Sequence, residues 1–148
     1  IGRVYQNPSM GNCPNMTILE NMSLADNKGK PFGLSFALNK KRYDFYREQL
    51  SSLGLGLEDK LHVKMGSLSG GQRQRVAVGR ALVAPGRAIL ADEPTGSLDP
   101  EMTDEVIDLL RHAAHQLGKC VIVVTHSKRV ADSADAVYTL RHKKLAKA

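Results

Sequence analysis

Polar side chains that can do chemistry stand directly after three short β-rich runs of this sequence. Gln6 follows "IGRVY", the acids Asp92 and Glu93 follow "AILA", and His126 follows "VIVVT". In metal-assisted phosphoryl transfer, adjacent carboxylates can divide the work: one holds Mg²⁺, and the next orients and deprotonates the attacking water. An acid after a strand is also a common turn or cap residue, so the prediction depends on the four side chains meeting in one place.

The three runs are expected to be strands of one parallel sheet. Strand and helix patterns alternate along the last third of the chain, which includes a further β-rich run, "AVYTL". This alternation predicts an α/β fold. "CVIVVTH" is continuously apolar up to its polar end, which predicts a strand buried on both faces. Open α/β sheets bind ligands beyond the carboxyl ends of their strands, so the four side chains would line one edge.

Helices are predicted in two regions. Residues 17–61 have a polar, helical pattern, which we interpret as a helical insertion on the sheet. A later amphipathic helix is predicted over "SLDPEMTDEVIDLLRHAAHQLG", in which Asp99 is the cap, Pro100 lies in the first turn and Gly118 ends the helix. The residues that share its apolar face are Val106, Leu110, Ala113 and Leu117.

The stretch "SLSGGQRQRVAVGRAL" begins a helix with two adjacent glycines, Gly70 and Gly71. Ser69 and Gln72 have the spacing of a capping box, which accounts for the helix start but needs no glycine. Glycine inside a helix costs about 1 kcal/mol relative to alanine. At the helix N-terminus it lets backbone N–H groups approach a ligand closely, where the helix dipole favours an anion. The glycines therefore predict a bound phosphate, and a well-capped helix is the alternative.

Composition narrows the class of protein. The net charge of +6 is compatible with nucleic acid or an anionic membrane surface, but a soluble domain with the basic tail "RHKKLAKA" explains it more simply. Trp is absent and aromatic residues are few, so nothing suggests base stacking. Cys13 and Cys120 lack metal-ligand spacing and are expected to be buried or free thiols in a reducing compartment. With no apolar run of roughly 18 residues and no signal-peptide pattern, we expect a soluble, cytosolic protein.

The segment "LSGGQRQRVAVGRAL" resembles the signature motif of the ATP-binding cassette (ABC) proteins. Further similarities follow the family's order: "VYQNP" resembles the Q-loop, "AILADEP" the Walker B strand, "GSLD" the D-loop and "VVTHS" the switch histidine. Together they cover essentially the whole chain. The resemblance implies an α/β protein with a partial P-loop NTPase (RecA-like) parallel-sheet core and an inserted α-helical subdomain.

The resemblance implies a role for each polar side chain at the predicted sheet edge. Asp92 would hold Mg²⁺, Glu93 would act as the general base, and His126 would contact the γ-phosphate of ATP. Gln6 would sense both Mg²⁺ and the attacking water. The family match therefore implies ATP and Mg²⁺ as cofactors.

The resemblance also implies a shared ATP site. In the family, two cassettes pack head to tail, so Ser69 and Gly71 would touch the ATP held by a partner subunit. Gly70 and Gln72 belong to the same ATP-binding motif, and Asp99 would lie at the dimer seam. The two glycines at the start of the helix, Gly70 and Gly71, would then contact an ATP molecule that is bound by another chain.

One departure from the family is large. The sequence contains no G-x-x-x-x-G-K-[ST] loop, whose backbone cradles phosphates. In the family that loop precedes the Q-loop, so a truncated chain is expected, with a degenerate copy as the alternative. We expect residues 1–11 to end a core strand and form the Q-loop, 12–84 to form the helical subdomain, and 85–148 to complete the core.

The function that the resemblance implies is that of an ATP-hydrolysing subunit of a membrane transporter. Its partners would be a second cassette and a transmembrane subunit, with no nucleic acid, and it would lie on the cytoplasmic face of the membrane. The fragment alone is expected to be inactive. A soluble cassette of DNA repair or translation and a non-catalytic interaction module are the alternatives. Up to about Gly66 the sequence resembles amino-acid-type importers, whereas after "GGQRQ" it resembles the lipoprotein-release and macrolide-export branch. The direction of transport is therefore left open.

Overall fold

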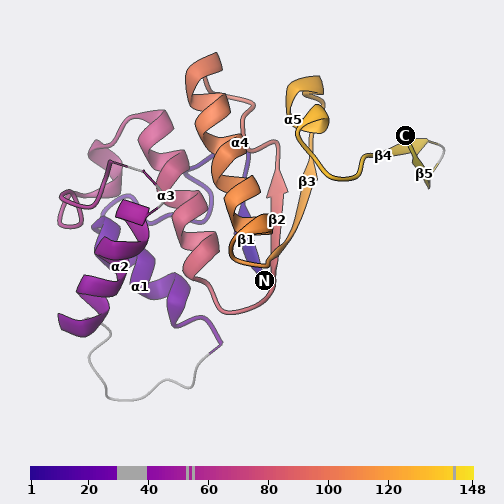
Figure 1. The fold of residues 1–148 in the computed structure, drawn as a ribbon. Helices are drawn as coiled ribbons and strands as arrows, with labels where there is room; N and C mark the ends of the chain where they lie inside the picture. The colour runs from indigo at the N-terminus through magenta and orange to yellow at the C-terminus, as the bar shows by residue number, and fades with distance from the viewer. Residues whose placement is uncertain (30–39, 53, 55, 142) are drawn as a thin grey trace.

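A three-stranded parallel sheet lies at the centre of the computed structural model (Figure 1). Its strands stand in the order β1 (Gly2–Val4), β2 (Ala88–Asp92) and β3 (Cys120–Val124). Because both pairings are parallel, the three strands end at the same edge of the sheet, as the sequence predicts. The structure describes residues 1–29, 40–52, 54, 56–141 and 143–148.

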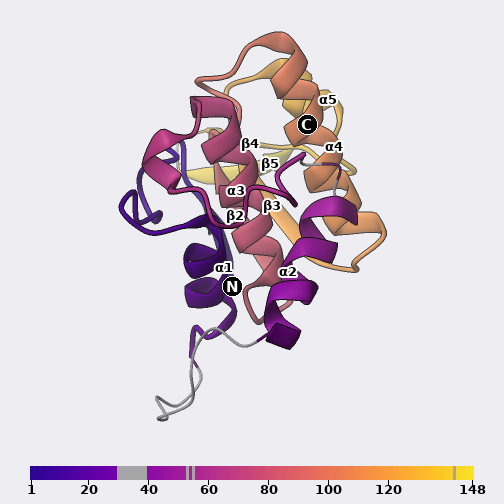
Figure 2. The same cartoon turned by 90° about the vertical axis from the view of Figure 1, so that its left-hand side faces the viewer.

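Most of the helices lie to one side of this sheet, whereas the short helix after β3 lies at its other side (Figures 1 and 2). They start where capping side chains satisfy the first free N–H groups: Thr17 caps α1, Ser69 caps α3 and Asp99 caps α4. Helix α3 packs on β1 and α1, and α4 packs on α3 and β3. The helices are α1 (Ile18–Asp26), α2 (Lys40–Ser52), α3 (Gly70–Val83), α4 (Pro100–His115), the short α5 (Lys128–Asp132) and a 3₁₀ turn, Met65–Ser67.

The hydrophobic core fills the space between the sheet and the helices and continues among the helices. The approach of α3 to β1 is close, since a Cβ placed on Gly2 would lie only 2.4 Å from the carbonyl oxygen of Ala81. Burying a Val, Ile or Leu side chain completely stabilises a fold by roughly 1.5–3 kcal/mol, so this layer accounts for much of the stability. Its fully buried members include Val4, Ile89, Val76, Val78, Val106 and Ala113.

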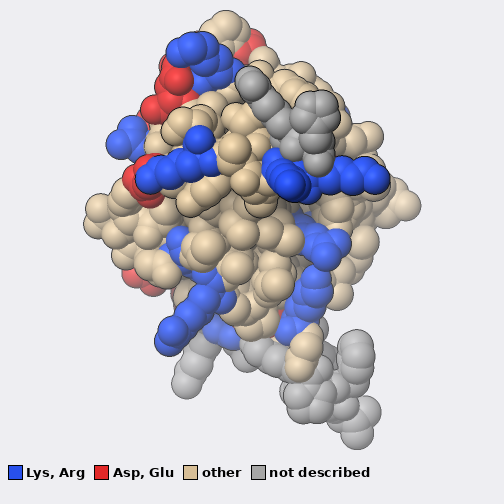
Figure 3. All heavy atoms as spheres, turned by 90° about the vertical axis from the view of Figure 1, so that its right-hand side faces the viewer, with Lys and Arg blue, Asp and Glu red and all other residues tan. Residues whose placement is uncertain are grey.

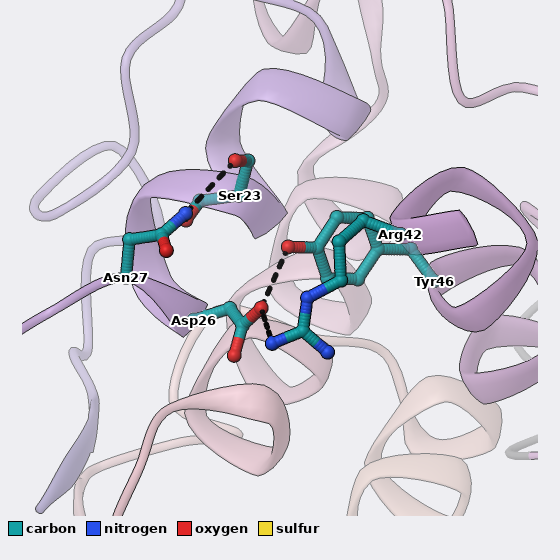
Figure 4. Close-up of polar contacts among 5 residues, drawn as sticks. All are labelled: Ser23, Asp26, Asn27, Arg42 and Tyr46. Carbon is teal, nitrogen blue, oxygen red and sulfur yellow. Dashed lines mark hydrogen bonds and ion pairs between the residues drawn. The ribbon is translucent and has the colours of Figure 1, made fainter. Parts of the chain in front are cut away.

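Helices α1 and α2 are joined by a buried polar cluster (Figure 4). The hydroxyl of Tyr46 donates to Asp26 Oδ2 at 2.9 Å, and the same oxygen lies 2.6 Å from Arg42 Nη2. Burial, reinforced by the hydrogen bond to Asp26 and its charge, raises the pKa of Tyr46 to about 12. Buried polar groups need such partners, so the cluster fixes how the two helices meet.

The structure corrects two predictions about burial. Strand β3 forms as expected, but it is not buried on both faces, because Ile122 and Val124 are 51% and 62% exposed. It is an edge strand in the described part of the chain, so its alternate side chains meet solvent. Leu117 does not share the apolar face of α4, since the helix ends at His115 and Leu117 is 44% exposed.

The C-terminal β-rich run also differs from its prediction. It forms β4 (Tyr138–Arg141), which pairs antiparallel with β5 (Lys144–Lys147) in a separate hairpin rather than joining the parallel sheet. The hairpin projects away from the main body (Figure 1). The side of the molecule that carries it shows more Lys and Arg than Asp and Glu (Figure 3), in keeping with the net charge of +6.

Cys13 and Cys120 are both free and exposed, so the expectation of free thiols is confirmed and that of buried thiols is wrong, while the reducing compartment stays a prediction. In the described part of the chain, no helix combines the length and apolar character that a bilayer span requires. The expected boundaries near residues 11 and 84 stay predictions. The second of them lies just after α3, which ends at Val83.

Candidate functional site

The end of β2 places the two predicted acids at the sheet edge. Asp92 is the last residue of the strand, pairs in register with Val124 and is exposed. Glu93 is half-buried, and its backbone N–H donates to the carbonyl oxygen of Val124 at 2.9 Å. The ladder therefore continues one residue beyond the strand, which holds Glu93 directly beside the end of β3.

The carboxylate of Glu93 is anchored by the segment that follows β3. Its Oε2 accepts from the hydroxyl of Thr125 at 2.9 Å, and its Oε1 accepts from the backbone N–H of His126 at 2.7 Å. A carboxylate offers about four lone-pair sites, so both oxygens can still accept from a water molecule. The two contacts orient the Glu93 carboxylate and leave lone pairs free to accept a proton. They also join two predicted catalytic residues, Glu93 and His126.

Gln6 reaches the same region from the end of β1. Its side chain is exposed, and its Nε2 would lie 3.6 Å from a Cβ placed on Gly96, as would Cβ of Glu93. Gly96 belongs to the turn after Glu93, because its N–H donates to the carbonyl oxygen of Glu93 at 3.1 Å. Three separate segments thus bring Gln6, Glu93 and His126 to one edge, as the sequence predicts.

The start of α3 has the predicted capping box. Ser69 Oγ accepts from the N–H of Gln72 at 3.2 Å, and Gln72 Oε1 accepts from the N–H of Ser69 at 3.1 Å. The two glycines differ. A Cβ on Gly70 would meet nothing within 4 Å, whereas a Cβ on Gly71 would lie 2.0 Å from Sδ of Met102. Space for a ligand therefore exists at Gly70, whereas a side chain at Gly71 would first require the flexible end of Met102 to move.

Asp99 is exposed and caps α4, since its Oδ1 accepts from the N–H of Met102 at 2.8 Å. Because Met102 also contacts Gly71, the N-terminal ends of α3 and α4 lie against each other. An ion pair between Arg75 and Glu105 joins the same two helices one turn further along. The five residues predicted to bind ATP therefore share one region of this chain.

A small pocket connects the two groups of residues. It has about 30 Å³ of space, and Gln6, Gly70 and Ser97 are among its lining residues. Gln6 and the turn after Glu93 thus meet the start of α3 across this pocket. Among the described residues, no group of three or more His, Cys, Asp or Glu side chains is arranged to hold a metal. A Mg²⁺ bound by one or two carboxylates and by phosphate oxygens needs no such group, so exposed Asp92 fits the predicted role.

Two residues that contact this site were not predicted from the sequence. Thr125 binds the Glu93 carboxylate, but a threonine at a strand end carries no signal of its own. Gln74 lies only 2% exposed within α3 and binds the segment after β2. Its signal was available, because it is the polar member of a helix face that is otherwise apolar: Ala77, Val78 and Ala81.

Comparison with known proteins agrees with this geometry. A family model described as ABC transporter matches residues 1–96. The tyrosine transport ATP-binding protein of Clostridioides difficile is 38% identical over 131 residues, which make up 88% of this chain and 52% of that protein. The lipoprotein-releasing system ATP-binding protein LolD of Rickettsia bellii is 38% identical over 125 residues, 84% of this chain and 56% of that protein. The chain spans about half the length of these relatives.

A solved structure supports the same assignment. The ATP-binding cassette MJ0796, solved as a dimer in a post-hydrolysis state bound to ADP and Pi, matches with a TM-score of 0.73 and 30% identity. The match covers 99% of this chain and 62% of that one. The fold is therefore the α/β fold of these ATPases. Since the family model covers well over half of its residues, the chain belongs to the ABC transporter family.

Proposed function

We propose that this chain is part of the ATP-binding subunit of a membrane transporter and that it contributes to ATP hydrolysis. The observation that carries the proposal is the anchored carboxylate of Glu93, which binds Thr125 and His126 at the edge where Gln6 also lies. The relatives support it, because both are named ATP-binding proteins of transport or release systems. Their names differ in cargo, so the proposal stops at the class of transporter.

The proposed division of labour follows from the placement of each side chain. Bound ATP and Mg²⁺ would supply the phosphoryl group and the positive charge that polarises it. Glu93 has free lone pairs toward which water can donate, so it acts as the general base. Asp92 offers the exposed oxygen ligands that Mg²⁺ prefers. His126 steadies Glu93 through its backbone N–H, and its imidazole stays at the exposed edge.

A second copy of the cassette is the proposed partner at the start of α3. The first N–H groups of a helix lack acceptors in their own helix and carry the positive end of its dipole. Gly70 leaves room for an anion to approach them. We place the ATP of a head-to-tail partner there, against Ser69, Gly70, Gly71, Gln72 and Asp99. The related cassette MJ0796 was solved as a dimer, which supports this arrangement.

A transmembrane subunit is the proposed second partner. The helical part, residues 12–84, would dock it, while residues 1–11 and 85–148 belong to the ATPase core. The protein would then lie at the cytoplasmic face of the membrane. Neither relative's name mentions nucleic acid, and no nucleic-acid partner is part of the proposal.

The test of the general base is Glu93→Gln in a cassette completed with an N-terminal segment that carries the G-x-x-x-x-G-K-[ST] loop. The amide can still accept from the N–H of His126 and can donate to Thr125, so folding and ATP binding should persist. Losing the proton acceptor should lower turnover about 10²- to 10⁴-fold. Steady-state phosphate release and ATP titration measure the two effects separately.

The matched control is Glu101→Gln, which removes the same charge from an exposed residue in the first turn of α4. It should leave turnover within about twofold. Near-normal turnover in Glu93→Gln would contradict the assignment of the base.

A further inference from the structure

The side chain of Gln74 links α3 to both loops that carry the proposed catalytic residues. Its Nε2 donates to the carbonyl oxygen of Pro94 at 2.7 Å and lies 3.5 Å from that of Tyr5. Pro94 directly follows Glu93, and Tyr5 directly precedes Gln6. One carboxamide therefore contacts the backbone directly next to each of two proposed catalytic residues: the residue after Glu93 and the residue before Gln6.

The turn that Gln74 holds is under backbone strain. Glu93 has φ +41°, a left-handed conformation that is uncommon for a residue other than glycine. Such conformations persist where surrounding contacts over-determine them. Within the turn, the N–H of Gly96 donates to Glu93 and that of Leu98 to Thr95, at 3.1 Å each. The bond from Gln74 adds a contact from a different element, which keeps the turn against α3.

The oxygen of the same carboxamide lacks a hydrogen-bond partner among the described residues. Gln74 is 2% exposed, and this oxygen, Oε1, is buried. Gln74 lines the pocket that it shares with Gln6, Gly70 and Ser97. About 30 Å³ is enough for one or two water molecules, which commonly satisfy buried polar groups. The pocket residues Gln6 and Ser97 supply the further polar partners that such a water needs.

We propose that Gln74 is a positioning residue for ATP hydrolysis. Its amide group holds the Glu93 turn and the Gln6 loop in register with the start of α3, and its Oε1 accepts from water in the shared pocket. The helix that would contact the partner's ATP is thereby tied to the residues that would attack the chain's own ATP. This inference rests on the proposed ATPase function.

The first test measures the turn in the 148-residue chain itself. Gln74→Met keeps the length of the side chain and removes both polar ends. Amide hydrogen exchange at Gly96 and Leu98 should become at least fivefold faster, because loss of an orienting bond favours local opening. Amides within α4 should keep their exchange rates. The control is Gln116→Met at the exposed end of α4, which should change neither. Unchanged exchange at Gly96 and Leu98 in Gln74→Met overturns the inference.

The second test uses the completed cassette and separates positioning from a merely structural role. Gln74→Met should lower kcat about tenfold or more and leave KM for ATP within about twofold, because no ATP contact is altered. Gln74→Glu adds a pH profile. A protonated carboxyl can donate to Pro94, whereas a carboxylate cannot, and burial raises the pKa of a carboxyl. The kcat of Gln74→Glu should therefore approach wild type at acid pH and fall as pH rises.

The outcomes separate the two proposals. If the wild-type completed cassette does not hydrolyse ATP, the proposed function fails, and with it the catalytic role of Gln74. If the wild type is active and Gln74→Met keeps its kcat, the inference alone fails. If Gln74→Met does not fold, Gln74→Glu decides: a kcat that follows wild type at every pH overturns the inference, and the predicted alkaline loss supports it.

Discussion

Glu93 shows how much of this site is decided at single residues. Its left-handed backbone costs of order 1–3 kcal/mol. The cost is offset by hydrogen bonds to three groups that follow one another at the end of β3: Val124, Thr125 and His126. A residue held in this way has little freedom to rotate, and a general base benefits from that restriction because its geometry is set before water binds.

Gly70 and Gly71 are adjacent but should respond differently to alanine. A Cβ on Gly70 meets nothing, so Gly70→Ala should leave stability unchanged or raise it by up to about 1 kcal/mol through helix propensity. A Cβ on Gly71 would require the flexible end of the half-buried Met102 side chain to move, so Gly71→Ala should give a modestly lower melting temperature than Gly70→Ala. Adding Met102→Ala should remove this difference, because the contacting side chain is then gone. Thermal unfolding of Gly70→Ala, Gly71→Ala, Met102→Ala and the Gly71→Ala/Met102→Ala double variant measures this coupling.

The same pair tests the phosphate proposal. In a completed cassette that carries Glu93→Gln, ATP-dependent dimerisation should weaken with Gly70→Ala although the fold stays intact. Gly71→Ala is less suited to this test, since packing and ligand effects would mix. Equal dimerisation with and without Gly70→Ala would remove the ligand explanation for that glycine and leave only its place at the helix start.

At the scale of elements, α3 packs against three others: β1, α1 and α4. It packs against β1 at Gly2, and Arg75 joins it to α4 through Glu105. Near its C-terminal end Arg80 contacts the carbonyl oxygens of Asn21 and Gly11, and burial lowers the pKa of this guanidinium. A displacement of α3 would therefore change its contacts with β1, α1 and α4 together. Such coupling is useful in a helix that is proposed to contact a partner.

The α1–α2 cluster predicts a pH dependence of stability. The pKa of Tyr46 is raised to about 12, so the folded state holds this proton more tightly than the unfolded state. Its contribution should be fully present below about pH 10, the unfolded value, and should be lost as pH rises through about 12. Tyr46→Phe should cost about 1–3 kcal/mol near neutral pH, because Asp26 loses a donor. It should also show less loss of stability between pH 10 and 12 than wild type.

Urea unfolding at several pH values measures both effects. The control is Tyr138→Phe in the exposed hairpin, where Tyr138 is 59% exposed. Its stability curve should follow wild type across this range. Parallel curves for Tyr46→Phe and wild type above pH 10 would mean that the Tyr46 hydroxyl does not titrate as its surroundings require.

At the scale of the whole molecule, we expect the 148-residue chain by itself not to turn over ATP. The proposed catalytic residues lie together at one sheet edge, but the sequence contains no G-x-x-x-x-G-K-[ST] loop to cradle phosphates. Positioned acids without a bound triphosphate have no reacting group to act on. Calorimetry with ATP and Mg²⁺ should detect no micromolar binding, and phosphate release should stay at background. The completed cassette is the positive control, and Mg²⁺-dependent turnover by the chain alone would refute this expectation.

Local signals in the sequence determined the helix starts and the list of candidate site residues. Ser69 and Asp99 cap their helices as predicted, because a cap is settled by a side chain and an N–H group three residues away. Glu93 and His126 follow their strands as predicted, and Asp92 is the last residue of its strand, because short apolar runs form strands that end close to the first polar residues. Their common edge followed from the parallel direction of the strands, which the alternating pattern indicated.

Tertiary structure alone decided which side chains touch and which faces stay open. Glu93 and Thr125 lie 32 residues apart, and Gln74 and Pro94 lie 20 apart, so no local pattern could pair them. The apolar run of β3 indicated burial but not which neighbours would cover it, and Val124 remains exposed. The run "AVYTL" had the composition of a strand, yet its partner was β5 rather than the sheet. Composition sets the tendency to form a strand or helix, whereas pairing and burial depend on what the rest of the chain brings alongside.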